Sequence, residues 1–293
     1  MEVSGVIVVD KPRDWTSHDV VAKLRGICRE KRIGHGGTLD PMATGVLPVF
    51  VGRATRAASL CESAEKEYLA ALRPGIVTDT QDITGTVLQR TDYPLTAPVL
   101  ESALERFRGI QEQIPPMYSA VKVGGKKLYE LARRGLETER QPRIITISEL
   151  ELTGERDGDY LLRIVCSKGT YVRTLVHDIG QYLGCGAVLS DLRRTRAGRF
   201  GLEHAYTLEE IADAAVRGCL ETLITSVDRL FDDLPALTVT AAEESRCRNG
   251  APLHLRKADG RYRVYSPTGE FLMVGSVQNG SLRSEKSFFR VAQ

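Results

Sequence analysis

The sequence predicts an α+β protein: a mixed, mainly antiparallel sheet flanked by helices, followed by a small β-rich domain. Short runs rich in β-branched residues alternate with segments whose apolar residues recur every three or four positions, as in strands and amphipathic helices. Two strand patterns between residues 143 and 167 are joined by a tight Arg-Asp-Gly-Asp turn, which favours antiparallel pairing. Near Pro235 the pattern changes to short strands separated by turns. We therefore expect two domains, residues 1–233 and 234–293.

The first half of the chain alternates strand and helix patterns. Gly5 to Asp10 reads as a buried strand that Lys11-Pro12 ends, and Thr16 or Ser17 can cap the helix that follows. In that helix, the apolar residues from Val20 to Cys28 lie at helical spacing. The remaining predicted elements are strands at 46–51, 65–73 and 86–90 and a helix at about 96–108.

The second half begins with an insertion at about 122–143 that is rich in Gly, Lys and Arg and contains a short helix near 127–134. Val172, Leu175, Val176, Ile179 and Leu183 are spaced 0, 3, 4, 7 and 11, which predicts a helix with one apolar face. The other expected elements are strands at 143–152, 160–167, 187–193, 261–265, 270–277 and from 282, acidic helical segments at 208–217 and 220–227, and a small helix from 240 that ends at Asn249-Gly250.

Composition excludes several classes of protein. The 293 residues are 42% apolar, enough for a sizeable core, and no apolar run approaches the length of about 20 residues that crosses a membrane. With no secretory signal pattern at the N-terminus, we expect a cytoplasmic protein without membrane partners. The six Cys and five His show neither disulfide nor zinc spacing, and no nucleotide-binding loop is present, so we expect no metal and no cofactor.

Charge is distributed unevenly despite a net value of +2. Residues 122–143 hold seven Lys or Arg against three Glu, and residues 193–199 hold four Arg and no acid. Residues 207–233 hold seven acids against two Arg. This asymmetry suits a polyanion held on one face, although solvated helix faces carry similar runs.

Asp40 stands out because of its surroundings. Three glycines (Gly34, Gly36 and Gly37) precede it, which would allow positive φ angles and close approach to a ligand. Pro41 favours an extended conformation at Asp40, and the apolar run from Val46 to Val51 would anchor the loop as a buried strand. Such a loop suits a fixed nucleophile, but the same residues also form ordinary turns.

The stretch from Gly34 to Leu47 resembles the signature of the TruB-type bacterial tRNA pseudouridine synthases, which modify the T-loop uridine (pseudouridine-55). The family pattern runs Gly-His-x-Gly-Thr/Ala-Leu-Asp-Pro-x-Ala-x-Gly-x-Leu, and this sequence matches it without a gap. A second resemblance is Lys66-x-Tyr68 followed by Asp79-Thr80-x-Asp82, and a third is the segment from Lys168 to Arg173. The resemblance extends over nearly the whole chain.

The resemblance assigns roles to individual residues. Asp40 would be the catalytic carboxylate, Tyr68 the aromatic that stacks on the target base, and Arg173 the partner of Asp40. The N-terminal end of a helix carries a partial positive charge, so an Arg in the first turn is unfavourable there. The position is explained if this Arg contacts a carboxylate. The substrate-binding residues would be His35, which fills the gap left by the flipped base, Leu192, which lines the uracil pocket, and Tyr171, Asp82, Lys11, Lys122 and Arg56.

Two positions depart from the family pattern. Asp14 replaces the usual Gly of the Asp-Lys-Pro-x-Gly-x-Thr-Ser element, which puts the turn there in doubt. Arg56 stands where the family usually has Lys, so a planar guanidinium group replaces a single ammonium group.

The resemblance implies a pseudouridine synthase fold with a PUA-like C-terminal RNA-binding domain and an insertion at 122–143 that closes on RNA. The enzyme would flip the T-loop uridine of tRNA, break the N1–C1′ bond, rotate the uracil and rejoin it through C5. The T-arm stem-loop would be the partner, with no cofactor and no obligate protein partner, and the chain would act as a monomer. Whether the carboxylate attacks C1′ or removes the C2′ proton stays open.

Two other classes of function compete with this interpretation. A non-catalytic RNA-binding protein would use the same basic surfaces, but it would not need the Asp, Tyr and Arg trio. A hydrolase with an aspartyl nucleophile would need a second carboxylate to activate water, and the sequence does not place one. A dehalogenase-type motif at Asp10 fails because Pro12 occupies the position of the second Asp.

Overall fold

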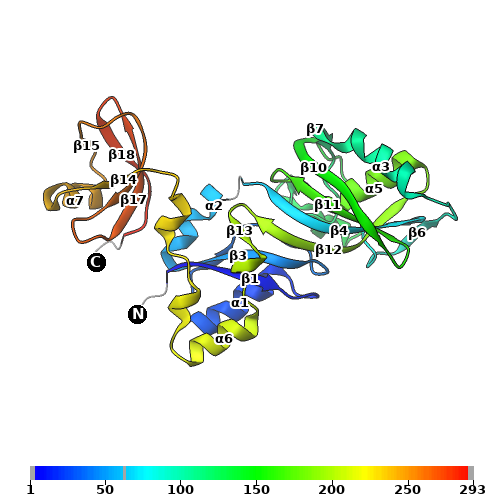
Figure 1. Cartoon of the computed structure of the whole chain (residues 1–293), viewed down its shortest axis with the longest axis horizontal. Helices are drawn as coiled ribbons and strands as arrows, with labels where there is room; N and C mark the ends of the chain where they lie inside the picture. Colours follow the sequence, from blue (N-terminus) through cyan, green and yellow to red (C-terminus); the bar gives the residue numbers. More distant parts are fainter. Residues whose placement is uncertain (1–3, 62–63, 290–293) are drawn as a thin grey trace.

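The computed structural model describes residues 4–61 and 64–289, which form two β-sheet domains (Figure 1). The larger sheet lies in the N-terminal part of the chain and confirms the predicted α+β class. Its nine strands are β1 (Gly5–Lys11), β2 (Ile33–His35), β3 (Thr44–Val51), β4 (Lys66–Pro74), β7 (Gly109–Gln113), β10 (Arg143–Arg156), β11 (Asp159–Cys166), β12 (Ala187–Ala197) and β13 (Phe200–Gly201).

The order β1-β3-β12-β4-β11-β10-β7 makes this sheet mixed but mainly antiparallel. β12 is its central strand: it pairs in parallel with β3 and antiparallel with β4. The predicted turn between β10 and β11 forms at Asp157 and Gly158, both with positive φ, as a two-residue hairpin requires. The topology therefore brings the strand after the Asp40 loop and the strand of Tyr68 to either side of β12.

Four α-helices pack through one apolar core against one face of this sheet. The Thr16 hydroxyl caps the first of them by accepting a hydrogen bond from the Asp19 amide, while the Asp19 carboxylate accepts one from the Thr16 amide. Such a capping box contributes about 1 kcal/mol and defines where the helix begins. The helices are α1 (Ser17–Cys28), α3 (Ala97–Leu104), α5 (Val172–Leu183) and α6 (Leu208–Val216).

The C-terminal domain is a five-stranded sheet in the order β14-β16-β17-β18-β15 with one helix. It packs on the opposite face of β1 and β3, where Phe231, Phe271 and Phe288 join Val6 and Phe50 in a second core. Its elements are β14 (Ala236–Thr238), α7 (Ala241–Arg248), β15 (Leu253–His254), β16 (Gly260–Tyr265), β17 (Phe271–Gln278) and β18 (Ser281–Ser287). The boundary between residues 233 and 234 stays a prediction.

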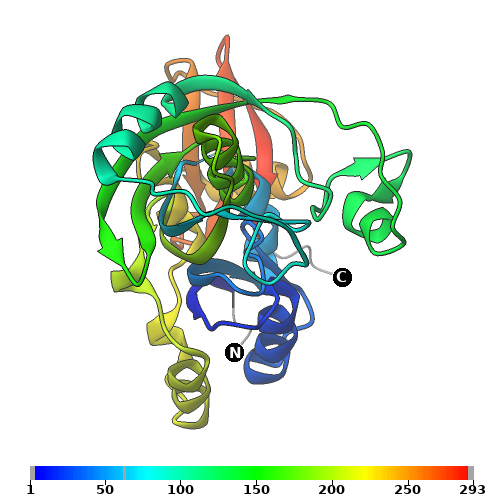
Figure 2. The same ribbon diagram turned by 90° about the vertical axis from the view of Figure 1, so that its right-hand side faces the viewer.

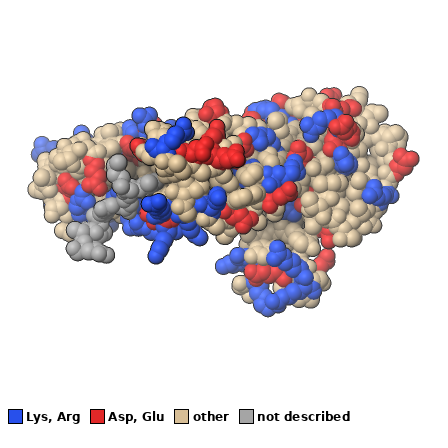
Figure 3. Space-filling view, turned by 90° about the horizontal axis from the view of Figure 1, so that it is seen from below, with Lys and Arg blue, Asp and Glu red and all other residues tan. Residues whose placement is uncertain are grey.

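The insertion projects from the body of the larger domain (Figure 2). It contains β8 (Lys122–Val123), β9 (Lys126–Lys127) and the expected short helix α4 (Leu128–Ala132). Seen from below, it forms a separate lobe in which Lys and Arg predominate over the few acids (Figure 3). The predicted basic surface therefore exists at this insertion.

The other basic run, residues 193–199, is not an open cationic surface. Arg193 pairs with Asp10 at 2.7 Å, Arg196 with Glu67 at 3.9 Å and Arg199 with Asp232 at 3.6 Å. Arg194 is 1% exposed. Alternate side chains on β12 point to opposite faces of the sheet, so this run is divided between two faces.

Several elements differ from the sequence prediction. The strand patterns missed β2 and β7, and β7 escaped detection because its sequence, Gly-Ile-Gln-Glu-Gln, is largely polar and exposed. The expected helix at 220–227 is instead two short 3₁₀ helices, η4 (Leu220–Leu223) and η5 (Val227–Phe231). The remaining short elements are η1 (Gly52–Ala57), α2 (Ala58–Cys61), β5 (Ile76–Thr78), β6 (Val87–Arg90), η2 (Glu105–Phe107) and η3 (Leu202–His204). Among the described residues, no helix is long and apolar enough to cross a membrane.

Candidate active site

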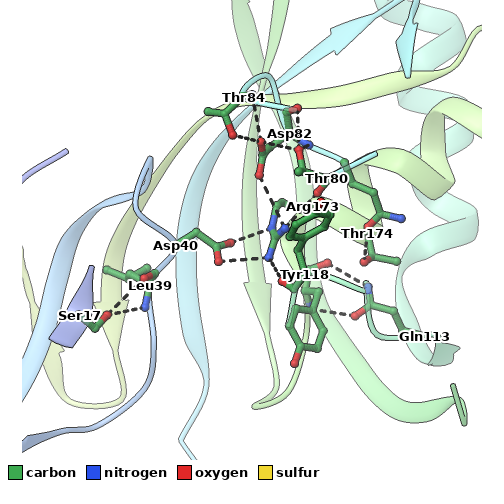
Figure 4. Close-up of polar contacts among 12 residues, drawn as sticks. Ser17, Leu39, Asp40, Thr80, Asp82, Thr84, Gln113, Tyr118, Arg173 and Thr174 are labelled. Atoms are coloured by element: carbon green, nitrogen blue, oxygen red, sulfur yellow. Dashed lines mark hydrogen bonds and ion pairs between the residues drawn. The ribbon is translucent and has the colours of Figure 1, made fainter. Parts of the chain in front are cut away.

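The loop between β2 and β3 carries Asp40, and α1 holds this loop in place. The Ser17 hydroxyl accepts a hydrogen bond from the Leu39 amide at 2.9 Å and lies 3.3 Å from the Leu39 carbonyl (Figure 4). The Ala43 amide donates to the Asp40 carbonyl at 3.0 Å and closes the turn. These contacts fix the backbone on both sides of the carboxylate.

The glycines before Asp40 serve different purposes. Only Gly37 of the three has a positive φ, 127°, so the expectation of freedom at all three was wrong. At Gly36 a Cβ would lie 2.8 Å from the Phe50 ring, which explains the glycine by packing. Asp14, which replaces a family glycine, has φ 65° and donates its amide to the Pro41 carbonyl at 2.8 Å. Because Asp tolerates the left-handed region better than most residues, the turn survives this replacement.

Arg173, in the first turn of α5, meets the Asp40 carboxylate (Figure 4). Its Nη2 donates a hydrogen bond to Asp40 Oδ1 at 3.1 Å, and its Nε lies 2.8 Å from Oδ2 as an ion pair. The Arg173 side chain is 5% exposed, whereas that of Asp40 is 34% exposed. The cation is therefore buried behind the carboxylate, which stays open to a ligand.

Further contacts fix the Arg173 guanidinium. It donates to the carbonyls of Thr80 at 3.0 Å and Tyr118 at 2.8 Å, and Asp82 Oδ2 lies 3.7 Å from its Nη1. Asp82 is itself 5% exposed, and its Oδ1 accepts hydrogen bonds from the hydroxyls of Thr80 and Thr84. Two carboxylates thus flank one guanidinium, and Asp40 is much the more exposed of the two.

An open cleft of about 1210 Å³ borders Asp40. Its lining includes Tyr68, Tyr171, Leu192, Asp82 and Arg173 of the predicted site. Tyr68 is 8% exposed, and burial raises the pKa of its hydroxyl. The structure therefore brings together six of the ten residues predicted from the sequence, counting Asp40, and the volume exceeds what one nucleoside needs.

The other four predicted residues lie elsewhere. His35 stacks edge-on against His18 at 5.5 Å between ring centroids, and it is His18 that lines the cleft. The Arg56 guanidinium donates to the Ser287 carbonyl at 2.9 Å, at the contact with the C-terminal domain. Lys122 is exposed on β8 in the insertion. Their assignment to substrate binding stays a prediction, which no contact within the cleft supports.

Lys11 is the fourth of these predicted residues, and it lies buried behind the Asp40 loop. Its side chain is fully buried, and Nζ donates to the carbonyls of Pro12 at 2.8 Å, Trp15 at 2.5 Å and Pro41 at 3.1 Å. It joins the turn before α1 to the residue that follows Asp40. Burial lowers the pKa of Lys11 to about 8.

This lowered pKa predicts how stability depends on pH. Between about pH 8 and pH 10.5 the unfolded chain holds the Lys11 proton while the folded chain releases it, so this group increases stability as the pH rises. We expect the free energy of unfolding of the wild type, minus that of Lys11→Met, to rise by about 2 kcal/mol from pH 8 to pH 10. Urea titrations followed by Trp15 fluorescence measure this difference. A difference that is flat or falls with pH would contradict the burial of Lys11 as an ammonium ion.

Sequence reasoning missed several residues of the site. Gln113 on β7 accepts a hydrogen bond from the Tyr171 amide at 2.8 Å and donates to the Tyr171 carbonyl at 3.1 Å, which fixes the start of α5. Thr80 and Tyr118 hold Arg173 through backbone carbonyls, which leave no trace in a sequence pattern. Arg194, which also lines the cleft, had been assigned only to a basic run. Because β7 itself was missed, its Gln113 could not be placed.

The arrangement suits nucleophilic or general-base chemistry next to a planar group. A carboxylate that is one-third exposed and held by a buried cation can act as a nucleophile or a base. An aromatic and an apolar side chain beside it can hold a planar base. The second carboxylate, Asp82, lies on the far side of Arg173 and is occupied by hydroxyl donors. It is therefore not placed to activate water, as a hydrolase would need.

Solved structures with the same fold give the class of protein. The chain is similar to one in the crystal structure of a Cbf5-Nop10-Gar1 complex, with TM-score 0.73, 28% identity and coverage of 98% of this chain and 85% of that one. It is also similar to a chain in the structure of an H/ACA RNP bound to a substrate RNA containing 2′-deoxyuridine, with TM-score 0.71, 27% identity and coverage of 98% and 86%. The fold is that of the pseudouridine synthases.

Sequence comparison gives the family within this class. Residues 25–172 match the TruB family pseudouridylate synthase N-terminal domain, and residues 173–232 match the tRNA pseudouridylate synthase B C-terminal domain. Relatives called tRNA pseudouridine synthase B include those of Syntrophomonas wolfei, 44% identical over 94% of both chains, and Geobacillus kaustophilus, 41% identical over 92% of this chain and 98% of the relative. The chain belongs to the TruB family of pseudouridylate synthases, so it is an isomerase.

Proposed function

We propose that this enzyme converts the T-loop uridine of tRNA, position 55, into pseudouridine, with Asp40 as its catalytic carboxylate. The relatives' names supply the tRNA substrate. The observation that carries the proposal is the ion pair of Asp40 with the buried Arg173 at the edge of the cleft. Of the two carboxylates that flank Arg173, Asp40 is the one whose side chain is substantially exposed.

Access to the sugar requires the uridine to leave its stack, which costs a few kcal/mol. Tyr68 forms part of the cleft wall and recovers some of that cost, since stacking of a base on an aromatic ring contributes about 1–3 kcal/mol. Leu192, which is 4% exposed, gives the detached uracil an apolar surface on which it can turn.

The chemistry needs no cofactor. The Asp40 carboxylate either attacks C1′ or removes the C2′ proton, and the N1–C1′ electron pair leaves with the uracil. After rotation, C5 bonds to C1′ while either the Asp40–C1′ bond breaks or the C2′ proton returns, freeing Asp40. C5 then loses its proton and N1 gains one, so the product is an isomer of the substrate. Arg173 keeps the carboxylate oriented while its charge changes.

Two parts of the chain would hold the T-arm, the basic insertion and the C-terminal domain. Lys127, Tyr129 and Arg133 of the basic insertion line the cleft directly. The C-terminal β domain, which we propose to be a PUA-like RNA-binding module, packs on the opposite side of the larger sheet. We propose that the enzyme works in the cytoplasm. We also propose that it works as a monomer, because Asp40, Arg173 and the cleft walls all come from one chain.

Pseudouridine mapping of a tRNA transcript tests the proposed function. We expect the pure protein to modify uridine 55 of an unmodified transcript and to leave untouched a matched transcript with cytidine at that position. Modification at another uridine, with none at 55, would overturn the proposed position. Absence of any pseudouridine in a transcript that binds tightly would favour a non-catalytic RNA-binding role.

Tyr68 is tested by two substitutions. Tyr68→Leu removes both the ring and the hydroxyl, and we expect it to slow C5 tritium release by about 10²-fold or more while tRNA binding persists. Tyr68→Phe keeps the stacking surface and separates the two roles. If both variants weaken binding alone, Tyr68 is only a stacking platform.

A further inference from the structure

The first turn of α5 is buried, and within the described chain its N-cap residue, Tyr171, makes no side-chain capping bond. Val172, Arg173 and Thr174 are each 5% exposed or less. In a capping box, a Glu or Gln three residues into the helix bonds the amide of the N-cap residue. Thr174 occupies that position here, and its hydroxyl donates to Gln81 Oε1 at 2.8 Å instead. The Tyr171 amide therefore needs a partner from another part of the chain, because an unpaired amide is costly in a buried place.

Gln113, the last residue of β7, supplies this partner from a distant strand. Its Oε1 accepts a hydrogen bond from the Tyr171 amide at 2.8 Å, and its Nε2 donates to the Tyr171 carbonyl at 3.1 Å (Figure 4). Gln113 is 4% exposed. A side-chain amide carries an acceptor and a donor at the same end, whereas an ionised carboxylate only accepts. Glutamine therefore matches both backbone groups of Tyr171.

Gln113 also lies at the root of the basic insertion. It pairs across the sheet with Arg143, the first residue of β10, and residues 114–142 connect these two strands. Arg143 lines the cleft. A second contact from the connecting segment reaches α5, because the Tyr118 carbonyl accepts a hydrogen bond from Arg173 Nη2 at 2.8 Å. The first turn of α5 is therefore bonded twice to the segment that leads into the insertion.

The placement of this first turn decides where Arg173 lies relative to Asp40. Arg173 Nη2 donates both to Asp40 Oδ1 at 3.1 Å and to the Tyr118 carbonyl, so a shift of the turn would move the cation away from the carboxylate. A misplacement of about 1 Å can lower the rate by about 10²-fold. The described residues that line the cleft include Tyr171 but not Gln113. Gln113 can therefore act on the reaction only through α5.

We propose that Gln113 is a positioning residue of the isomerisation: by capping α5 from the root of the insertion, it fixes Arg173 relative to the Asp40 loop. This inference rests on the catalytic roles proposed above for Asp40 and its partner Arg173. It gives the polar edge strand β7 a function in the site, because this strand ends at the residue that holds the catalytic helix. The helix and the insertion proposed to hold RNA thus share one anchor.

The first test is Gln113→Met, which introduces an apolar side chain of similar length that can make neither bond. We expect kcat to fall by about 10²-fold with an unchanged KM for tRNA, because the insertion and the cleft still bind RNA while the catalytic pair is displaced. Gln111→Met is the matched control. Gln111 lies on the same strand, but its Nε2 donates to the Phe107 carbonyl at 2.6 Å, and it is not among the described residues that line the cleft. This control should keep the wild-type kcat.

Combining Gln113→Met with Arg173→Lys shows whether Gln113 acts through Arg173. In the Arg173→Lys enzyme the two-point contact with Asp40 is already lost, so Gln113→Met has little left to displace. We expect it to lower kcat there by no more than about threefold further, since mutations that act through one contact are not additive. A general loss of folded protein would instead lower kcat by the same factor in both backgrounds.

Equal factors in the two backgrounds, or a wild-type kcat in Gln113→Met, would overturn the proposal. Should that variant not fold, Gln113→Glu takes its place in the same cycle. An ionised glutamate still accepts from the Tyr171 amide but cannot donate to the carbonyl, so kcat should fall by about tenfold. The rate is measured as total pseudouridine formed in unmodified tRNA, so the comparison holds whichever uridine is the target. A full kcat in Arg173→Lys alone would refute the role of Arg173 itself, which is a separate failure.

Discussion

Replacing Asp40 by asparagine should abolish pseudouridine formation while the enzyme still binds tRNA. The substitution keeps the shape of the side chain and removes the charge that Arg173 faces, so neither attack on C1′ nor proton abstraction at C2′ remains available. We expect tritium release from tRNA with [5-³H]uridine to fall by at least about 10⁴-fold. Binding should persist, because the basic insertion and the cleft walls are unchanged.

Asp191→Asn is a matched control for this variant. Asp191 also pairs with guanidinium groups, those of Arg13 and Arg156, but its side chain is exposed and it does not line the cleft. Its loss should leave tritium release intact. Turnover by Asp40→Asn at a rate comparable to that of the control would mean that another group performs the chemistry.

The second large effect is expected from Arg173→Met. This change leaves Asp40, Asp82 and the carbonyls of Thr80 and Tyr118 without their shared donor. Breaking such a pair should cost about 3 kcal/mol of stability, the lower end of the range for buried pairs because Asp40 is one-third exposed. We expect kcat to fall by about 10²–10³-fold, since the carboxylate loses its orientation. Thermal unfolding and single-turnover rates measure the two effects.

Arg173→Lys separates charge from geometry. It keeps a cation near Asp40, but one ammonium group cannot contact two carboxylates and two carbonyls together, so stability should recover more than kcat does. Arg163→Met, which breaks a partly exposed network with Glu67 and Glu149, should cost about 1 kcal/mol and leave kcat unchanged. A full kcat in Arg173→Lys would show that charge alone suffices.

The elements with strong local signals were predictable from the sequence. α1 begins where Thr16 caps it, and α5 follows from the apolar spacing of Val172 to Leu183, which also placed Arg173 in a first turn facing the site. β7 could not be predicted, because an exposed edge strand has no apolar period and is held by its pairing with β10. Extensions of β10 and β12 beyond their predicted ends likewise depend on neighbouring strands.

Contacts between two side chains of the site could be predicted from the sequence. Contacts between a side chain and a backbone carbonyl could not. The roles of Asp40, Tyr68 and Arg173 came from the resemblance, and the structure places the three around one cleft. Lys11 and Arg194 contact carbonyls of distant residues, Pro41, Gly37 and Val46, and carbonyls are present at every position of a chain. Only the folded topology shows which of them these cations reach.

The most direct test is the structure of Asp40→Asn in complex with a T-arm stem-loop that carries uridine 55, since this variant should hold the substrate without turnover. We predict that the uridine is everted against Tyr68, with its C1′ about 3–3.5 Å from the side-chain oxygen at position 40, the separation of reacting atoms before attack. A bound stem-loop whose uridine 55 remains stacked, or whose ribose lies away from position 40, would contradict the central role of this carboxylate.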